Sequence, residues 1–218
     1  MIEFVSIHEE ELLTAVPLFF LSFWWYAFLI MQSRRIQIGV MGSASDLKYS
    51  TDIERLAFEV GALLAEKDAI TVYGAEKDYD SLSTAAARGA KSKGGLTVGV
   101  TYGKGKDIWD KEGNTDVLIC SGLERGGGRE FVLVNSCDAI IIISGGSGTL
   151  TEAAIAYQLN IPIVALVGTG GWADKLAETY IDNRQRFKVL PAQTPTEAVT
   201  TALSLAAAPA ADLNCHSL

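Results

Sequence analysis

The stretch SGGSGTLTE, Ser144–Glu152, has the residue types best suited to holding a phosphate group. Its glycines allow positive φ angles and let the backbone approach a ligand closely. Because it follows a strongly apolar run and opens a predicted helix, its amides and the helix N-terminus form an anion-binding site. We predict that five residues bind the phosphate: Gly145, Gly146, Ser147, Gly148 and Thr149. A tight strand–helix turn without a ligand is the alternative.

Glu152, three residues after Thr149, admits two interpretations. A carboxylate can stabilise an oxocarbenium-like transition state or orient an attacking water, which would make Glu152 catalytic. Thr149 and Glu152 also have the spacing of a capping box, in which the two residues cap the helix and have no part in chemistry. The sequence leaves both interpretations open.

A second glycine cluster, RGGGRE (Arg125–Glu130), places Arg129 in the first turn of a predicted helix. The helix dipole disfavours a cation there. We expect an anion to offset it, either a ligand or Glu152, and Arg129 is therefore a candidate catalytic residue. A solvated surface arginine is the alternative.

The turn MGSASD (Met41–Asp46) follows the first predicted strand. We expect Gly42 and Ser43 to contact the ligand from this neighbouring strand end. The Ser43 hydroxyl would act as a hydrogen-bond partner of the ligand.

Short apolar runs alternate with longer amphipathic segments and must position these residues. Strands are predicted at 36–41, 69–74, 96–103, 116–120, 139–144, 162–167 and 187–190. Helices are predicted at 51–65, 82–93, 129–136, 148–159, 172–180 and 195–205. Continuously apolar strands separated by helices predict an α/β fold, a Rossmann-like doubly wound parallel sheet in three layers (α/β/α). Such sheets bind ligands at the carboxyl ends of their strands.

The composition and charge of the chain limit the molecules that it can bind. The net charge of −8 and the pI of about 4.8 argue against a nucleic-acid binder that works through a broad basic surface. The two histidines, His8 and His216, lie near the chain ends, and no cysteine or histidine spacing suits a metal site. We therefore predict no metal, no cofactor and no nucleic-acid partner, but a phosphate-bearing small molecule. The cysteine usage fits a reducing cytoplasm.

Arg129, the run DAIIIISGG and the motif SGTLTE together resemble the LOG-like nucleotide-binding proteins of the SLOG superfamily. This Rossmann-like group includes cytokinin riboside 5′-monophosphate phosphoribohydrolases and is related to molybdenum cofactor carrier-like proteins. Its pattern is an Arg-Lys pair, a helix, a strand and then Pro-Gly-Gly-x-Gly-Thr-x-x-Glu. The resemblance covers residues 36–205 and implies nucleotide binding, a homodimer or higher homo-oligomer, and site roles for Arg129 and Glu152.

The chain departs from that pattern in three places. Ser144 stands in the position of the proline, and Glu130 in that of the lysine. The segment YGAEKDYDSLS (Tyr73–Ser83) replaces a glycine-rich turn after the second strand.

Residues 12–33 carry no charged side chain and are about as long as a membrane-spanning helix. Acidic residues precede them, and Arg34 and Arg35 follow, which would place the rest of the chain on the cytoplasmic side. Met31 offers another start, which would make the segment a start-site artefact; a helix buried in an oligomer is a third alternative. The predicted division is a hydrophobic segment (1–34), a LOG-like nucleotide-binding domain (35–206) and a flexible tail (207–218). We predict a cytoplasmic protein, tethered to a membrane only if the segment is real.

Three hypotheses for function follow. An enzyme would hydrolyse the N-glycosidic bond of a nucleoside 5′-monophosphate to the free base and ribose 5-phosphate. A non-catalytic carrier or sensor would hold a nucleotide or a molybdenum-cofactor-type pterin, and Glu130 with the altered Tyr73–Ser83 turn favours this class. A membrane-tethered interaction module depends on the N-terminal segment.

Overall fold

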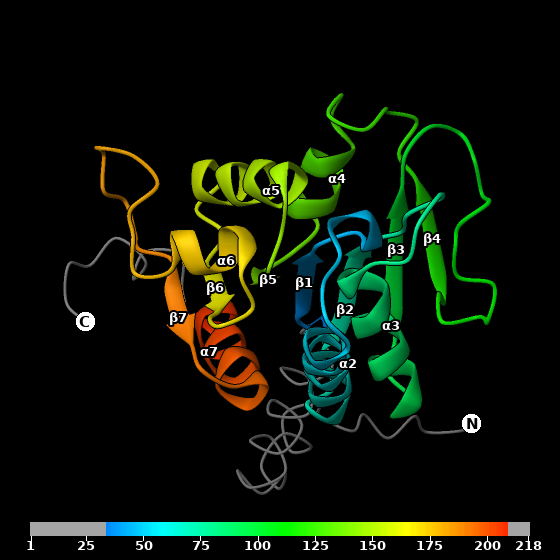
Figure 1. The fold of residues 1–218 in the computed structure, drawn as a ribbon, viewed down its shortest axis with the longest axis horizontal. Coiled ribbons are helices and arrows are strands. Elements are labelled where there is room, and N and C mark those ends of the chain that lie inside the picture. The colour runs from blue at the N-terminus through cyan, green and yellow to red at the C-terminus, as the bar shows by residue number, and fades with distance from the viewer. Residues whose placement is uncertain (1–33, 209–218) are drawn as a thin grey trace, which may run out of the picture. The chain divides into compact units, whose positions relative to one another are not determined.

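The computed structural model describes residues 34–208, which contain a seven-stranded, wholly parallel sheet (Figure 1). The strands are β1 (Gln37–Gly42), β2 (Ile70–Gly74), β3 (Thr97–Thr101), β4 (Val117–Cys120), β5 (Ala139–Ile143), β6 (Ile163–Leu166) and β7 (Leu190–Ala192). Their spatial order is β4-β3-β2-β1-β5-β6-β7. The order therefore reverses between β1 and β5, where Gly42 pairs with Ile143 at the carboxyl ends. Doubly wound sheets bind ligands at such a switch point.

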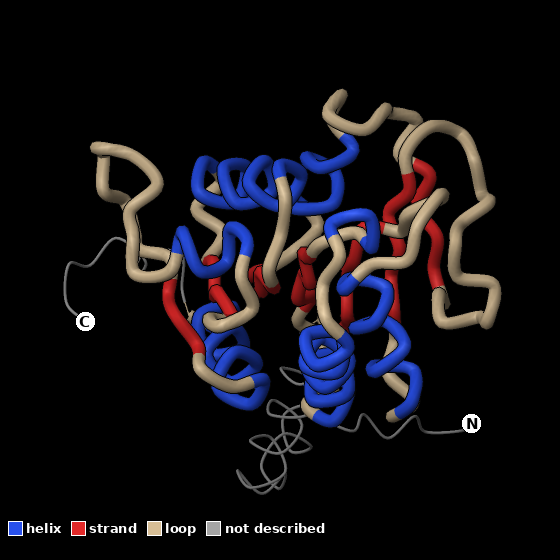
Figure 2. Tube along the Cα trace, viewed as in Figure 1, coloured by secondary structure: helices blue, strands red, loops and turns tan. Residues whose placement is uncertain are grey.

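Helices cover both faces of the sheet (Figures 1 and 2). One face carries α2 (Thr51–Glu66), α3 (Leu82–Ser92) and α7 (Pro195–Ala207), and the other carries α4 (Arg129–Asn135), α5 (Ser147–Gln158) and α6 (Gly171–Leu176). Neighbouring strand residues point to opposite faces, so Val40 and Ile141 join the first core cluster while Met41 and Ile142 join the second. The predicted three-layer Rossmann-like fold is confirmed.

Two connections near the site are not regular helices. A short 3₁₀ helix, η1 (Ser45–Leu47), follows β1. The link from β3 to β4 is a long loop, residues 102–116, and Asp116 at its end accepts a hydrogen bond from the Thr97 amide at 2.8 Å. This loop begins with Tyr102, which lies beside the site described below.

The predicted strand at 187–190 is wrong in position, because β7 begins only at Leu190. The preceding residues fold back on the segment that follows α6: Tyr180 and Lys188 form an isolated antiparallel bridge. The Phe187 ring packs against Tyr157 of α5, with centroids 5.1 Å apart. Tertiary contacts thus hold this segment away from the sheet edge.

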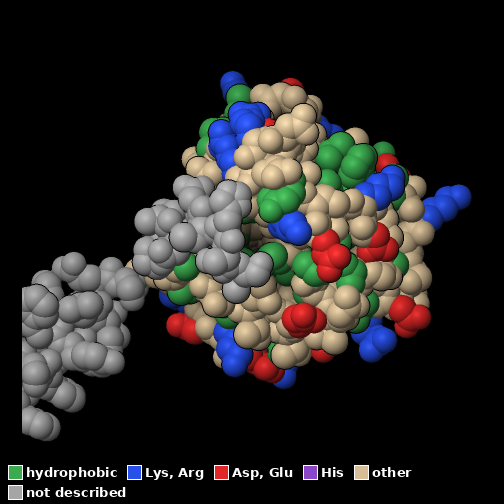
Figure 3. All heavy atoms as spheres, turned by 90° about the vertical axis from the view of Figure 1, so that its left-hand side faces the viewer, with side chains coloured by type: hydrophobic (Ala, Val, Ile, Leu, Met, Phe, Trp, Pro, Cys, Tyr) green, Lys and Arg blue, Asp and Glu red, His purple; other side chains and the backbone are tan. Residues whose placement is uncertain are grey.

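The surface in Figure 3 carries basic and acidic side chains interspersed with each other, and neither sign gathers into one broad patch on that face. Within residues 34–208, no helix is both long and apolar enough to cross a membrane. The apolar segment 12–33 and the chain after residue 208 lie outside the described residues.

Candidate functional site

The glycine-rich turn after β5 is fixed on one side by α6. Ser144 and Gly145 have positive φ angles of 55° and 103°. The Ser144 amide donates to the Thr169 hydroxyl at 2.8 Å. The carbonyls of Ser144 and Gly145 accept hydrogen bonds from the amides of Ala173 (2.8 Å) and Trp172 (3.0 Å). Ser144 is therefore no neutral replacement for proline, which has neither this φ nor an amide donor.

Helix α5 starts without a side-chain cap, and its N-cap residue is Gly146. In residues 34–208, the amides of Ser147, Gly148 and Thr149 find no hydrogen-bond acceptor. These unpaired donors lie at the positive end of the helix dipole, as an anion site requires. The capping-box interpretation is wrong, because the helix begins before Thr149 and Glu152 lies a turn further along it.

Ser43 joins the turns after β1 and β5. Its buried hydroxyl accepts a hydrogen bond from the Gly145 amide at 2.8 Å and donates to the Ser144 hydroxyl at 3.1 Å. Gly42 meets α3, since a β-carbon there would lie 2.7 Å from the Leu82 β-carbon. Both residues thus have structural roles at the switch point, and their contact with a ligand stays a prediction.

Arg129 and Glu152 come together from α4 and α5, with Arg129 Nη1 3.8 Å from Glu152 Oε1. Only 5% of the Arg129 side chain is exposed, so the surface-arginine alternative is wrong. Its Nε and Nη1 atoms are buried without a hydrogen-bond partner in the described part of the chain. A buried donor without an acceptor is costly unless a ligand supplies one.

Burial raises the pKa of Glu152 to about 7, against an ordinary value of 4.5. The nearby Arg129 guanidinium lowers this pKa, while the carboxylates of Glu130 and Glu76 raise it further. A carboxyl group with this pKa changes protonation near neutral pH and is suited to general acid–base chemistry.

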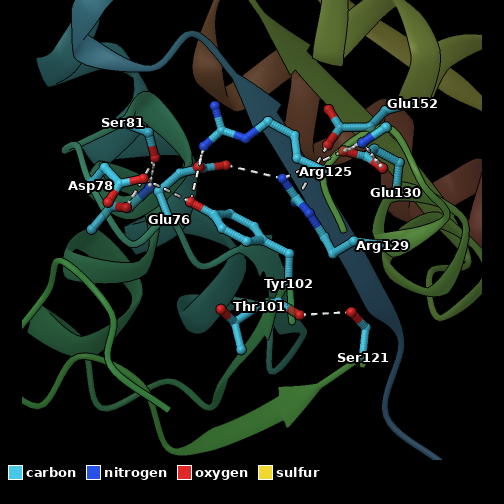
Figure 4. A network of polar contacts seen from close by, with 12 residues as sticks. Glu76, Asp78, Ser81, Thr101, Tyr102, Ser121, Arg125, Arg129, Glu130 and Glu152 are labelled. Carbon is cyan, nitrogen blue, oxygen red and sulfur yellow. Dashed lines mark hydrogen bonds and ion pairs between the residues drawn. The ribbon is translucent and has the colours of Figure 1, made fainter. Parts of the chain in front are cut away.

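Glu76, in the turn after β2, is a site residue that the sequence reasoning missed (Figure 4). Its Oε1 accepts a hydrogen bond from Arg129 Nη2 at 3.0 Å, and its other oxygen pairs with Arg125. The Arg125 guanidinium also lies over the Tyr102 ring, 5.0 Å from its centroid. The available signal was an acidic residue at the end of a strand beside β1. The anion that offsets Arg129 at the start of α4 is thus chiefly Glu76.

Glu130, at the position of the family's lysine, is buried and turned toward its own loop. Both of its oxygens accept the Gly126 amide, at 3.2 and 3.1 Å. Its Oε1 also lies 3.8 Å from Arg129 Nη2. In this part of the chain, residues 34–208, no group of three or more His, Cys, Asp and Glu side chains could hold a metal ion.

Comparison with known proteins identifies the family of this chain. Residues 35–199 match the model of a family described as the SLOG cluster4 family. An uncharacterized protein of Archaeoglobus fulgidus is 37% identical over 131 residues, which are 60% of this chain and 80% of that protein.

Solved structures that cover most of this chain include two molybdenum cofactor proteins. The molybdenum cofactor binding protein of Rippkaea orientalis is 25% identical, with a TM-score of 0.66 over 80% of this chain and 99% of that one. The molybdenum cofactor carrier protein of Chlamydomonas reinhardtii is 27% identical, with a TM-score of 0.67 over 80% of this chain and 100% of that one. The predicted relationship to the SLOG superfamily is confirmed.

Proposed function

Because this chain belongs to the SLOG cluster4 family, we propose that it binds a phosphate-bearing nucleotide or nucleotide-like ligand at the carboxyl ends of β1 and β5. The observation that carries the proposal is the uncapped start of α5, where Ser147, Gly148 and Thr149 present amides without protein partners in the described residues. The phosphate would accept from these amides, and the ligand would extend toward the unpaired nitrogens of Arg129.

Retention of the ligand without turnover is the function that the site supports best. Glu130 puts a carboxylate where the LOG-like pattern has a lysine, and the Gly126 amide donates to it, so the site has no Arg-Lys cation pair beside the proposed phosphate. The similar proteins of R. orientalis and C. reinhardtii are a molybdenum cofactor binding protein and a molybdenum cofactor carrier. We therefore propose a carrier or sensor of a nucleotide or pterin-type molecule.

Hydrolysis is the second candidate, and the buried Glu152 favours it. Its pKa of about 7 would let the carboxylate accept a proton from water at neutral pH. The water oxygen would bond to the ribose C1′ as the N-glycosidic bond breaks, and Glu152 would pass the proton that it took from the water to the departing base. The products would be the free base and ribose 5-phosphate.

The test uses the purified full-length protein with a panel of nucleoside 5′-monophosphates. Calorimetry measures binding, and chromatography measures free base and ribose 5-phosphate. Binding without release supports the carrier, and release that disappears in Glu152→Gln supports the hydrolase. If no member of the panel binds, the same experiment with a pterin phosphate decides whether the site holds such ligands at all.

A homo-oligomer and a cytoplasmic location remain part of this proposal, carried by family resemblance and cysteine usage. Light scattering on the eluted protein tests the first. Fractionation of cells that express the full chain tests the second and shows whether the segment before Arg34 tethers the protein.

A further inference from the structure

We propose that Glu76 is a positioning residue, which holds the Arg129 guanidinium against its own carboxylate and so prevents it from closing on Glu152. This inference deepens the proposed function and rests on it, because Arg129 and Glu152 are the residues assigned to the ligand. The LOG-like sequence pattern, an Arg-Lys pair followed by the glycine-rich motif, does not include Glu76.

The distances around Arg129 show which partner holds it. Arg129 Nη2 lies 3.0 Å from Glu76 Oε1, within hydrogen-bonding distance. Its contacts with Glu152 and Glu130 are both 3.8 Å long, beyond that distance. All four side chains are largely buried, so water cannot replace a lost partner easily.

The hydrogen bond to Glu76 leaves two nitrogen atoms of Arg129 free. With Nη2 taken by Glu76, the Nη1 and Nε atoms of Arg129 stay unpaired among the described residues. If the guanidinium moved the short distance to Glu152, Nη1 would be used and the carboxylate would be locked in its charged form. Glu76 therefore keeps Arg129 available to a ligand and Glu152 able to take up a proton.

Glu76 is itself held from a second side. Its other oxygen pairs with Arg125, whose guanidinium stacks on Tyr102 and donates to the Tyr102 hydroxyl at 3.1 Å. That hydroxyl donates in turn to Asp78 at 3.3 Å. Figure 4 shows this chain of contacts leading from the turn after β2 to Arg129. The charged groups that face Glu152 are thus Arg129 and Glu130 from α4 and Glu76 from the β2 turn.

The experiment is a carboxyl carbon-13 NMR titration of ligand-free, full-length protein labelled at glutamate. Glu152→Gln assigns the Glu152 resonance by its disappearance. Glu76→Gln removes the negative charge. Glu76→Asp keeps the charge but places the carboxylate farther from Arg129, because the side chain is one methylene shorter. Glu59→Gln is the matched control, because Glu59 is an exposed glutamate on α2, outside the contacts that lead to Arg129.

We expect the pKa of Glu152 to fall by about one unit or more in both Glu76 variants, as Arg129 closes on Glu152. Glu59→Gln should leave it unchanged. A fall in Glu76→Gln alone would mean that Glu76 acts only through its charge, and the proposal would be overturned. No change in either variant, or an equal change in Glu59→Gln, would overturn it as well.

A surface variant keeps the proposal testable if the Glu76 variants do not fold. About half of the Arg125 side chain is exposed, and Arg125→Lys keeps its charge while weakening its hold on Glu76. Glu76 would then hold Arg129 less firmly, and the pKa of Glu152 should fall; an unchanged or higher pKa contradicts the proposal. Since no ligand is used, this result is independent of the binding assay, and either can fail alone.

Discussion

Gly74 and Arg129 lie in direct contact: a β-carbon on Gly74 would overlap Nη1 of the Arg129 guanidinium. Gly74 is the last residue of β2 and needs no positive φ angle, so space alone explains the glycine. The guanidinium occupies that space and from there reaches Glu76, two residues along the chain. The absence of a side chain at position 74 is thus part of how the site is built.

Gly74→Ala should therefore push Arg129 out of its position. We expect a loss of about 1–3 kcal/mol in the free energy of unfolding, the usual cost of overpacking a buried site. Binding of nucleoside monophosphates should weaken as well. Gly105→Ala is the control, because nothing lies within 4 Å of a β-carbon there. Equal urea midpoints for the two variants would show that the contact does not constrain Arg129.

The raised pKa of Glu152 predicts how stability depends on pH. A buried carboxyl group with a pKa of about 7 binds its proton more tightly in the folded state than in the unfolded state, where the value is near 4.5. Its contribution to stability is present in full below pH 4.5 and is lost as the pH rises to about 7. The lost contribution amounts to about 3 kcal/mol at most.

Glu152→Gln should remove this dependence, because glutamine does not titrate. Urea unfolding between pH 5 and pH 8 should show a shallower decline for the variant than for the wild type. The exposed Glu59 on α2 offers a control in Glu59→Gln, which should keep the wild-type slope. Parallel slopes for all three proteins would exclude an elevated pKa at Glu152.

The fold was largely predictable because burial on both faces of the sheet leaves long apolar runs in the sequence. The run 139–143 is fully buried, and its sequence is continuously apolar. The region before β7 was misplaced because its path depends on tertiary contacts. Glu178 adopts a φ of 63°, and the next residues bridge back to Lys188 instead of extending into the sheet.

The sequence predicts the site only where its residues are contiguous in one segment. The turn after β5 is visible because its glycines and its helix start are contiguous. The pairing of Arg129 with Glu76 joins residues 53 positions apart. Predicting this pair would require the strand order, the end of β2 and the room that Gly74 leaves for the guanidinium. No local sequence pattern encodes these three features.

Ser43→Ala should destabilise the switch point. The variant leaves the buried Gly145 amide without its 2.8 Å acceptor, at a cost of about 1–3 kcal/mol. Ser45→Ala, in the exposed 3₁₀ helix that follows, should change stability by no more than about 0.5 kcal/mol. Thermal unfolding of both variants measures the difference, and similar melting temperatures would mean that the link between the two turns contributes little.

Two proline substitutions in the glycine-rich turn should separate its folding role from its binding role. Proline cannot adopt the φ of 55° at Ser144, and it lacks the amide that donates to Thr169. Ser144→Pro should therefore lower the free energy of unfolding by more than about 1 kcal/mol. Ser147 is the first residue of α5, where proline is tolerated, and Gly146 before it is already extended.

Ser147→Pro should therefore leave the urea midpoint nearly unchanged while removing one amide donor from the proposed phosphate site. A hydrogen bond to a charged group contributes about 1.5–3 kcal/mol, so the affinity for AMP should fall by about 10-fold to 100-fold. Calorimetry on the two variants and the wild type measures this. Unchanged affinity in a folded Ser147→Pro protein would place the phosphate elsewhere than at the start of α5.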